Sequence, residues 1–304
     1  MIHPISFSIP ECKIVEKVET KTILISPLIP GKSSTYIYNT EEEYYNAYKR
    51  CFFAHTKKKS GWDCLRHYEI MACGTIPVFE KIEECPKNTL TTIDKNLLQE
   101  CCNTWNKVST KVINELTNDE KNDLYNLCNK VLNYAKSYLS SKALAQYILS
   151  SVKFSEAKNI LYISDNPNKP DYLRCLTLIG FKDLLNGNVH DYPEIPHIYT
   201  KNNINYSKLY GKGFTYSQVV DKNHRNNVLD KTIEKDITNK KYDLVVYGKM
   251  NYRNYKGEPY LYKKVMEVYE AKYVVFLWGA DIPSSIDPKF WSDKGHNIFV
   301  RELK

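Results

Sequence analysis

The residues with the clearest chemical potential lie between Lys57 and Gly74, where a basic loop leads into a predicted helix. Backbone N–H groups and the dipole at a helix N-terminus attract anions, and a glycine lets the backbone approach a ligand closely. The segment therefore predicts an anion site, and its candidate ligand-contacting residues are Lys57, Lys58, Lys59, Ser60, Gly61, Arg66, Glu69 and Gly74.

Arg66 and Glu69 are three residues apart and so share one face of this helix. A planar guanidinium can grip a diphosphate at two points. A carboxylate one turn away can accept hydrogen bonds from ribose hydroxyls. The pair therefore predicts a nucleotide-diphosphate pocket. The alternative is an ion pair on a solvent-exposed helix face, with the three lysines as a solvated loop.

Three residues are candidates for a general base that deprotonates an acceptor hydroxyl. Asp165 and Asp281 follow apolar runs that are typical of buried strands, and His190 stands beside Asp191. Parallel sheets bind ligands at the carboxyl ends of their strands, so Asp165, which ends the first strand of the second half, is the first candidate, and His190 and Asp281 come next. For each candidate, a cap, a turn or an ion pair is the alternative role. Asp63 is predicted as a helix N-cap, and His67 as a structural residue.

The elements that must position these residues alternate between strands and helices. Capping-box spacing at Thr40/Glu43 and at Thr117/Glu120 predicts two helix starts. The first helix is expected to run through Cys51, and the second region to about Val152. Helices are also predicted over 63–73, 172–185 and 260–270, and strands over 22–26, 76–79, 159–164, 242–247, 273–278 and 297–301.

Apolar strands separated by helices predict an α/β fold with parallel sheets covered on both faces. We expect two Rossmann-like domains, over residues 1–152 and 157–304, joined near 150–157. Within the second domain, residues 206–216 interleave aromatic, basic and glycine residues. That stretch has the composition to stack sugars or bases. Its alternative role is a glycine-rich loop at the sheet edge.

The string GWDCLRHYEIMACGTIPVF, residues 61–79, resembles the nucleotide-sugar-binding half of GT-B and exostosin-like glycosyltransferases of large DNA viruses and some bacteria. Within it, Glu69 to Val78 is similar to their E-x-x-A-x-G-x-P-V motif, with one extra residue. The resemblance implies a metal-independent sugar transfer from a UDP- or GDP-linked donor to a glycan or glycoprotein. It also implies that Glu69 binds the ribose, that Arg66 and Lys59–Gly61 meet the diphosphate, and that Gly74 permits the turn into a strand.

Two features depart from that family's pattern. The family has an acidic residue eight positions before the ribose-binding Glu, where this chain has Gly61. The nucleotide-binding half also comes first here, which permits a GT-B-like fold with permuted domain order and equally a transferase domain cut from something longer. Residues 159–177 and the ending IFVREL resemble domains found beside such transferases.

Composition excludes several other classes of protein. With 42% hydrophobic and 26% charged residues, the chain is typical of a globular protein and not of a disordered one. We expect no membrane span, no secretory signal and no disulfide scaffold, and hence a cytoplasmic location, in a host cell or a virion if the chain is viral. Six of the eight net positive charges fall in residues 151–304. A nucleic acid partner, or a modified base as acceptor, is therefore an alternative, as is a non-catalytic nucleotide-sugar-binding partner of another enzyme.

Overall fold

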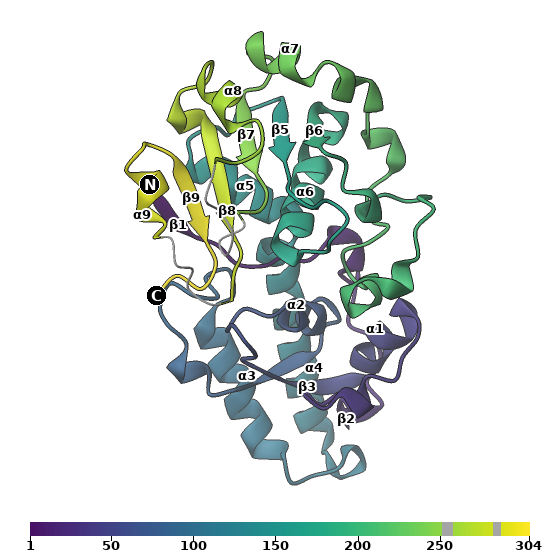
Figure 1. The fold of residues 1–304 in the computed structure, drawn as a ribbon. Coiled ribbons are helices and arrows are strands. Elements are labelled where there is room, and N and C mark those ends of the chain that lie inside the picture. Colours follow the sequence, from purple (N-terminus) through teal and green to yellow (C-terminus); the bar gives the residue numbers. More distant parts are fainter. Residues whose placement is uncertain (251–257, 282–286) are drawn as a thin grey trace.

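Two separate parallel β-sheets organise the chain, which a computed structural model describes over residues 1–250, 258–281 and 287–304 (Figure 1). The larger sheet has the strand order β1-β9-β8-β7-β5-β6, and the smaller one the order β2-β3-β4. The larger comprises β1 (Ile2–Pro4), β5 (Ile160–Ile163), β6 (Val189–Tyr192), β7 (Leu244–Tyr247), β8 (Val274–Trp278) and β9 (Asn297–Val300). The smaller comprises β2 (Ile23–Ile25), β3 (Cys51–Lys57) and β4 (Ile76–Glu80). Every described strand pairing is parallel, so the predicted α/β class is confirmed.

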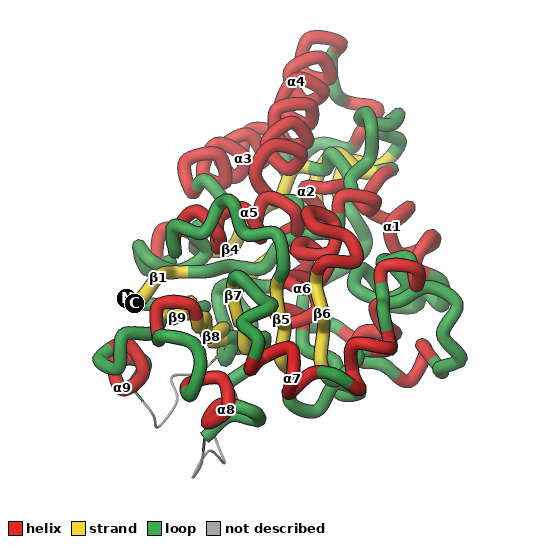
Figure 2. Tube along the Cα trace, turned by 90° about the horizontal axis from the view of Figure 1, so that it is seen from above, coloured by secondary structure: helices red, strands yellow, loops and turns green. Residues whose placement is uncertain are grey.

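Helices cover both faces of the larger sheet (Figure 2). Alternate side chains of β5 point to opposite faces, so that Ile160 and Tyr162 join one hydrophobic cluster while Leu161 and Ile163 join another. The first cluster includes α5 (Ser141–Ser151) and α6 (Tyr172–Leu185). The second is covered by α7 (Ile233–Thr238), α8 (Tyr262–Met266) and α9 (Lys289–Ser292). Burial on both faces is why the inner strands β5, β7 and β8 are apolar throughout rather than alternating.

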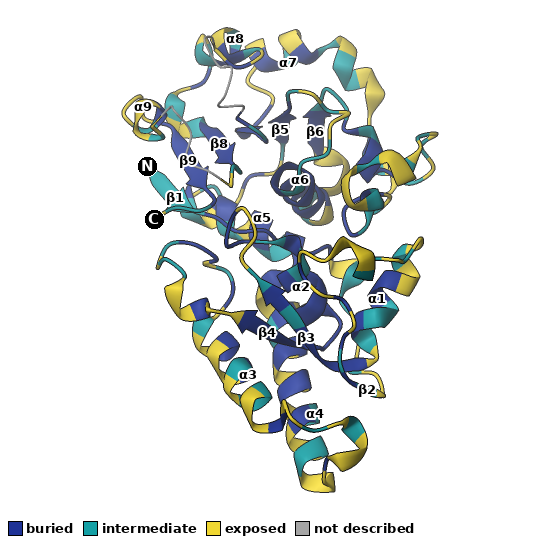
Figure 3. Cartoon of the chain, turned by 60° about the horizontal axis from the view of Figure 1, so that its bottom comes forward, coloured by how far each residue is buried: buried dark blue, intermediate teal, exposed yellow. Residues whose placement is uncertain are grey.

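The helices of the first half surround the smaller sheet. They are α1 (Glu41–Lys49), α2 (Leu65–Ala72), α3 (Lys95–Val108) and α4 (Asn118–Tyr134). Both predicted capping boxes are confirmed, with Thr40 accepting from the Glu43 N–H and Thr117 from the Glu120 N–H. Helices α2 and α6 are buried almost all round, whereas α3 and α4 expose one long face (Figure 3).

Three predicted helices have different limits in the structure. Helix α1 stops at Lys49, and Cys51 instead begins β3, the buried middle strand of the smaller sheet. The region opened by Thr117 does not run unbroken to Val152, because Ser140 has extended backbone and caps a new helix, α5. The N-terminal segment holds this break open, since Ile9 bonds through its backbone to Leu139 and Ser141. The predicted helix over 260–270 is reduced to α8.

The first strand belongs to the sheet of the second half (Figure 2). Residues Ile2–Pro4 pair in parallel with Ile298–Val300, and the terminal amine donates to the carbonyl of His296. The start of the predicted 1–152 domain is therefore part of the sheet of the predicted 157–304 domain. The chain crosses between the two sheets near residues 5–10 and again after α5. A contact between distant segments, rather than a local pattern, determines this arrangement.

Close packing of α5 on α6 joins the two halves and depends on Gly180. A Cβ added there would lie 1.9 Å from the carbonyl oxygen of Ser141. We expect Gly180→Ala to lower the free energy of unfolding by at least about 2 kcal/mol, because overpacking outweighs the gain in helix propensity. Urea denaturation measures the change. The control is Gly187→Ala, where a Cβ meets nothing within 4 Å and we expect a change below about 0.5 kcal/mol. Equal stability of the two variants would contradict this account.

Candidate functional site

The predicted anion site opens into a cavity of about 820 Å³ between the two halves. This volume is within the range of small-molecule sites, roughly 300–1,000 Å³. From the first half, five of the predicted ligand-contacting residues line it: Lys59, Ser60, Gly61, Arg66 and Glu69. From the second half come Tyr172, Tyr210, Lys212, Phe214 and Asp281. The structure therefore brings the basic loop and helix α2 together with one of the three candidate bases.

Helix α2 is capped differently from the prediction. Cys64, not Asp63, is the N-cap residue, and no side chain caps it. Asp63 is buried instead, accepting from the Phe7 N–H at 2.7 Å and from the Tyr68 hydroxyl at 2.8 Å. Burial raises the pKa of Asp63 to about 6, although Arg301 beside it favours the ionised form. Asp63 thus ties the loop before α2 to the N-terminal and C-terminal segments, and α2 keeps free N–H groups at its start.

A chain of hydrogen bonds orients Arg66. Its Nε donates to Thr56 Oγ1 at 3.2 Å, and one terminal nitrogen donates to the Tyr36 hydroxyl at 3.1 Å. Thr56 in turn bonds to Nδ1 of His67 at 2.7 Å, and His67 Nε2 bonds to the Trp62 carbonyl at 2.8 Å. Because a carbonyl only accepts, Nε2 carries the imidazole proton and Nδ1 accepts from Thr56. This chain leaves further N–H donors of the guanidinium for a ligand in the cavity.

His67 is structural, as the sequence predicts, and this has a consequence for stability. Burial lowers its pKa to about 3, so only the unfolded chain binds a proton between pH 6.5 and 3. The stability that His67 contributes must therefore fall as the pH drops below about 6.5. From pH 7 to pH 5 we expect the wild type to lose about 2 kcal/mol more than His67→Gln, which keeps a donor and an acceptor without titrating. Urea denaturation at both pH values measures this, and parallel losses would refute it.

Glu69 is buried rather than paired with Arg66 on a solvent-exposed face, so the surface-pair alternative is wrong. One carboxylate oxygen accepts from the Tyr44 hydroxyl at 2.6 Å, and the other from the Thr215 hydroxyl at 2.5 Å. Burial raises the pKa of Glu69, while these two hydrogen bonds favour the ionised form. The predicted ribose-binding carboxylate thus lies in the cavity wall, already bonded to protein hydroxyls.

The other predicted ligand-contacting residues have different surroundings. The Lys57 ammonium lies 3.9 Å from the Glu80 carboxylate, and the Lys58 ammonium lies 5.0 Å from the centre of the Trp62 ring. Neither lysine is among the residues that line the cavity. Gly74 has a φ of +59° at the end of α2, as the predicted turn requires. It is not among the residues that line the cavity.

At Gly61 the loop before α2 packs closely against the second half. A Cβ there would lie 2.5 Å from a carboxylate oxygen of Glu302 and 3.2 Å from one of Asp281. Any larger residue would displace these carboxylates. This chain has glycine where the family pattern has an acid. The carboxylates of Asp281 and Glu302, from the second half, occupy the space beside it.

The three candidate bases are not brought together. Asp281 lines the cavity, with its carboxylate bonded to Arg301. His190 is buried in β6, bonded to the Tyr242 hydroxyl and to Asp230. Asp165 follows β5, where its carbonyl accepts from Arg174, and it is not among the lining residues. By position alone, Asp281 is the candidate that a ligand in this cavity would meet.

Several aromatic residues of the cavity carry no motif. Tyr36, Tyr38 and Tyr44 come from the segment around α1, and the Tyr44 ring lies 5.7 Å from that of Phe214. The predicted aromatic and basic stretch 206–216 supplies the cavity residues Tyr210, Lys212 and Phe214. The tyrosine-rich segment 36–48 was not predicted as part of the site, although its composition could have indicated it.

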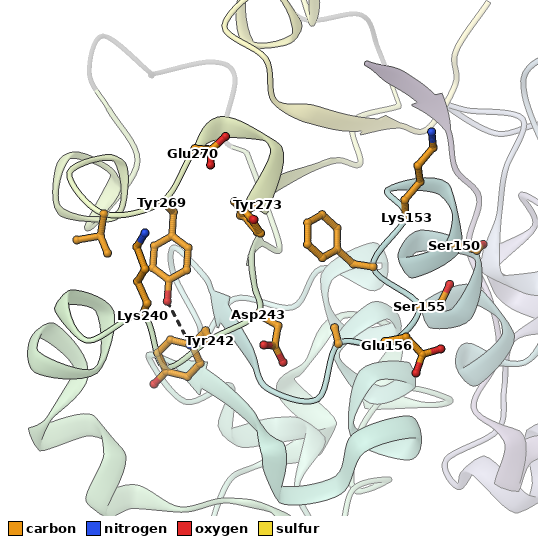
Figure 4. A pocket seen from close by; sticks show the side chains of 13 residues that line it. Ser150, Lys153, Ser155, Glu156, Lys240, Tyr242, Asp243, Tyr269, Glu270 and Tyr273 are labelled. Atoms are coloured by element: carbon orange, nitrogen blue, oxygen red, sulfur yellow. Dashed lines mark hydrogen bonds between the residues drawn. The ribbon is translucent and has the colours of Figure 1, made fainter.

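A second cavity, of about 740 Å³, lies at the amino ends of the strands of the larger sheet (Figure 4). Its walls include Phe154, Tyr242, Asp243 and Tyr273, which precede β5, β7 and β8 in the chain. The Tyr269 hydroxyl accepts from the Tyr242 N–H at 3.2 Å. Amino ends of parallel strands are not where such sheets bind ligands. No predicted site residue lines this cavity.

Comparison with protein-family models, with curated proteins and with solved structures finds no match to this chain. Over the described residues, no helix has both the length and the hydropathy to cross a membrane. In the same part of the chain, no group of three His, Cys, Asp or Glu side chains is placed to hold a metal ion. The cavity between the halves is therefore the basis for assigning a function.

Proposed function

We propose that this protein is a glycosyltransferase that moves a sugar from a UDP- or GDP-linked donor to an acceptor hydroxyl. One observation carries the proposal. A cavity of nucleotide-sugar size is lined by Arg66 and the start of α2 from one α/β half and by Asp281 from the other. A GT-B-like arrangement with the nucleotide-binding half first accounts for both sides. The residues of the first half would bind the donor, and those of the second would face the acceptor.

The diphosphate would lie at the start of α2. Here the free N–H groups, the guanidinium of Arg66 and the ammonium of Lys59 all present positive charge to the same space. When the bond to the sugar breaks, negative charge develops on the leaving diphosphate. Donors already held in place stabilise that charge without reorganising. Glu69, one turn further along α2, would accept from the ribose hydroxyls.

Asp281 would act as the general base. In an inverting transfer, the acceptor oxygen attacks the anomeric carbon and gives its proton to the carboxylate of Asp281. At the same time the bond to the diphosphate oxygen breaks, and the electron pair leaves with the nucleotide. The Arg301 guanidinium, which also donates to the Gly279 carbonyl at 2.9 Å, holds the carboxylate toward the cavity. A base must lie within hydrogen-bond reach of the proton it takes.

Titration of the purified chain with UDP, GDP, CMP, ADP and their common sugar conjugates tests the proposal. A ligand at a hundred times its dissociation constant adds about 2.7 kcal/mol to the free energy of unfolding. We expect the compounds of one nucleotide, UDP or GDP, to give this stabilisation. We also expect the sugar conjugate of that nucleotide to release the free nucleotide during incubation with the protein. If none of these compounds stabilises the protein, the proposal is overturned. If the chain instead bound duplex DNA with a steep salt dependence, the nucleic acid alternative would replace it.

A further inference from the structure

A segment of the second half reaches into the wall of the first half. We call residues 211–215 the clamp. The Lys212 ammonium donates to the Tyr38 carbonyl at 2.6 Å and to the Asn39 side chain at 3.0 Å. The Thr215 N–H donates to a carboxylate oxygen of Glu41 at 2.5 Å. These contacts link the start of α1 and the two residues before its N-cap to a loop 173 or 174 positions further along the chain, beside the cavity.

The backbone of the clamp is strained at Thr215. Its φ is +76°, although a β-branched residue rarely adopts the left-handed region. Gly211, Lys212 and Gly213 also have positive φ, at 60°, 57° and 74°. Glycine adopts positive φ freely, but at Lys212 and Thr215 this conformation persists only where the surrounding contacts impose it, and such strained residues cluster at ligand clamps and switch regions. The contacts that impose this one are the hydrogen bonds of Thr215 itself.

The Thr215 side chain is fully buried and completes the hydrogen bonding of Glu69. Its hydroxyl has one proton, which goes to the carboxylate because a carboxylate only accepts. The same oxygen then accepts from the Tyr45 hydroxyl at 2.9 Å. The Tyr44 hydroxyl donates to the second carboxylate oxygen. Without Thr215, one oxygen of a buried carboxylate would lose its donor, which is costly.

We infer that the clamp is an internal occupant of the ribose subsite, which a nucleotide must displace. This inference rests on the proposed function, in which Glu69 binds ribose. A ribose hydroxyl takes the place of the Thr215 hydroxyl on Glu69, so the carboxylate never loses a donor. Relief of the strained backbone then favours withdrawal of the clamp. Nucleotide binding is thereby coupled to release of a contact between the two halves.

The test compares Thr215→Val, which keeps the shape but removes the hydroxyl, with Thr215→Ser, which keeps the hydroxyl. Two readouts are used: the rate of tryptic cleavage after Lys212, and the dissociation constants of UDP and GDP. For Thr215→Val we expect at least fivefold faster cleavage and at least fivefold tighter binding. For Thr215→Ser we expect both within twofold of the wild type. Saturating nucleotide should accelerate cleavage of the wild type, whereas an ordinary bound ligand protects a loop.

Slower or unchanged cleavage after Lys212 together with weaker nucleotide binding in Thr215→Val would overturn the inference. If Thr215 only orients Glu69, Thr215→Val binds nucleotide more weakly and is cleaved at the wild-type rate. Thr215→Ala, which also removes the hydroxyl and keeps a Cβ at the positive φ, provides the same comparison if the valine variant does not fold. The cleavage rates need no nucleotide. If no variant binds nucleotide, the proposed function fails and the ribose subsite with it; faster cleavage of Thr215→Val would then show only that the Thr215 hydroxyl holds the clamp on Glu69.

Discussion

Arg66→Ala is expected to weaken binding of the nucleotide diphosphate by about 10- to 100-fold. A hydrogen bond to a charged group contributes about 1.5–3 kcal/mol, and each 1.4 kcal/mol is a factor of ten in affinity. The guanidinium is pre-oriented by Thr56 and by the Tyr36 hydroxyl, so little side-chain entropy is lost when it binds phosphate. Isothermal titration calorimetry with UDP and GDP measures the change.

The matched control is Lys58→Ala, which removes the same charge eight residues away. The Lys58 ammonium lies over the Trp62 ring and is not among the residues that line the cavity. We expect its affinity for nucleotide to stay within twofold of the wild type. Arg66→Lys keeps the charge but loses the planar fork, so we expect an intermediate loss. Equal losses in Lys58→Ala and Arg66→Ala would mean that net charge, rather than this site, attracts the ligand.

Asp281→Asn is expected to lower the rate of sugar release from the donor by a factor of about 10² to 10⁴, the usual contribution of a general base. The amide keeps the size of the side chain but cannot take a proton from an acceptor hydroxyl or water. Nucleotide affinity should remain within threefold, because the diphosphate contacts belong to the other half. Single-turnover release of nucleotide from the donor, measured beside calorimetric binding, separates the two effects.

The control for this experiment is Asp165→Asn, at one of the two base candidates that do not line the cavity. We expect the rate of this variant to stay within threefold of the wild type. The reverse result, with Asp165→Asn inactive and Asp281→Asn active, would move the reaction to the edge of β5 and refute the assignment. Loss of nucleotide binding in Asp281→Asn would instead make Asp281 a binding residue.

Features that depend on neighbours in the chain could be predicted from the sequence. The capping boxes at Thr40 and Thr117 are made of residues three apart, and both are present in the structure. Strands β4, β5, β7, β8 and β9 were recognised because both of their faces are covered, which requires continuous apolar residues, whereas β1 and β6 were not predicted. Strand β3 was missed, because Cys51 continues the apolar spacing of the preceding helix while tertiary contacts start a strand there.

The sequence by itself determined the α/β class, the parallel sheets and the basic loop that enters α2, since each depends on local hydrogen bonding and on the period of apolar residues. Only the tertiary structure decided what faces that loop. Strand order places Asp281 and Glu302 against Gly61, buries Asp63 beside Arg301 and brings Thr215 to Glu69. These partners are between 146 and 241 positions apart. Contacts at such separations arise from how the sheets pack, and the spacing of residues along a single chain carries no record of that packing.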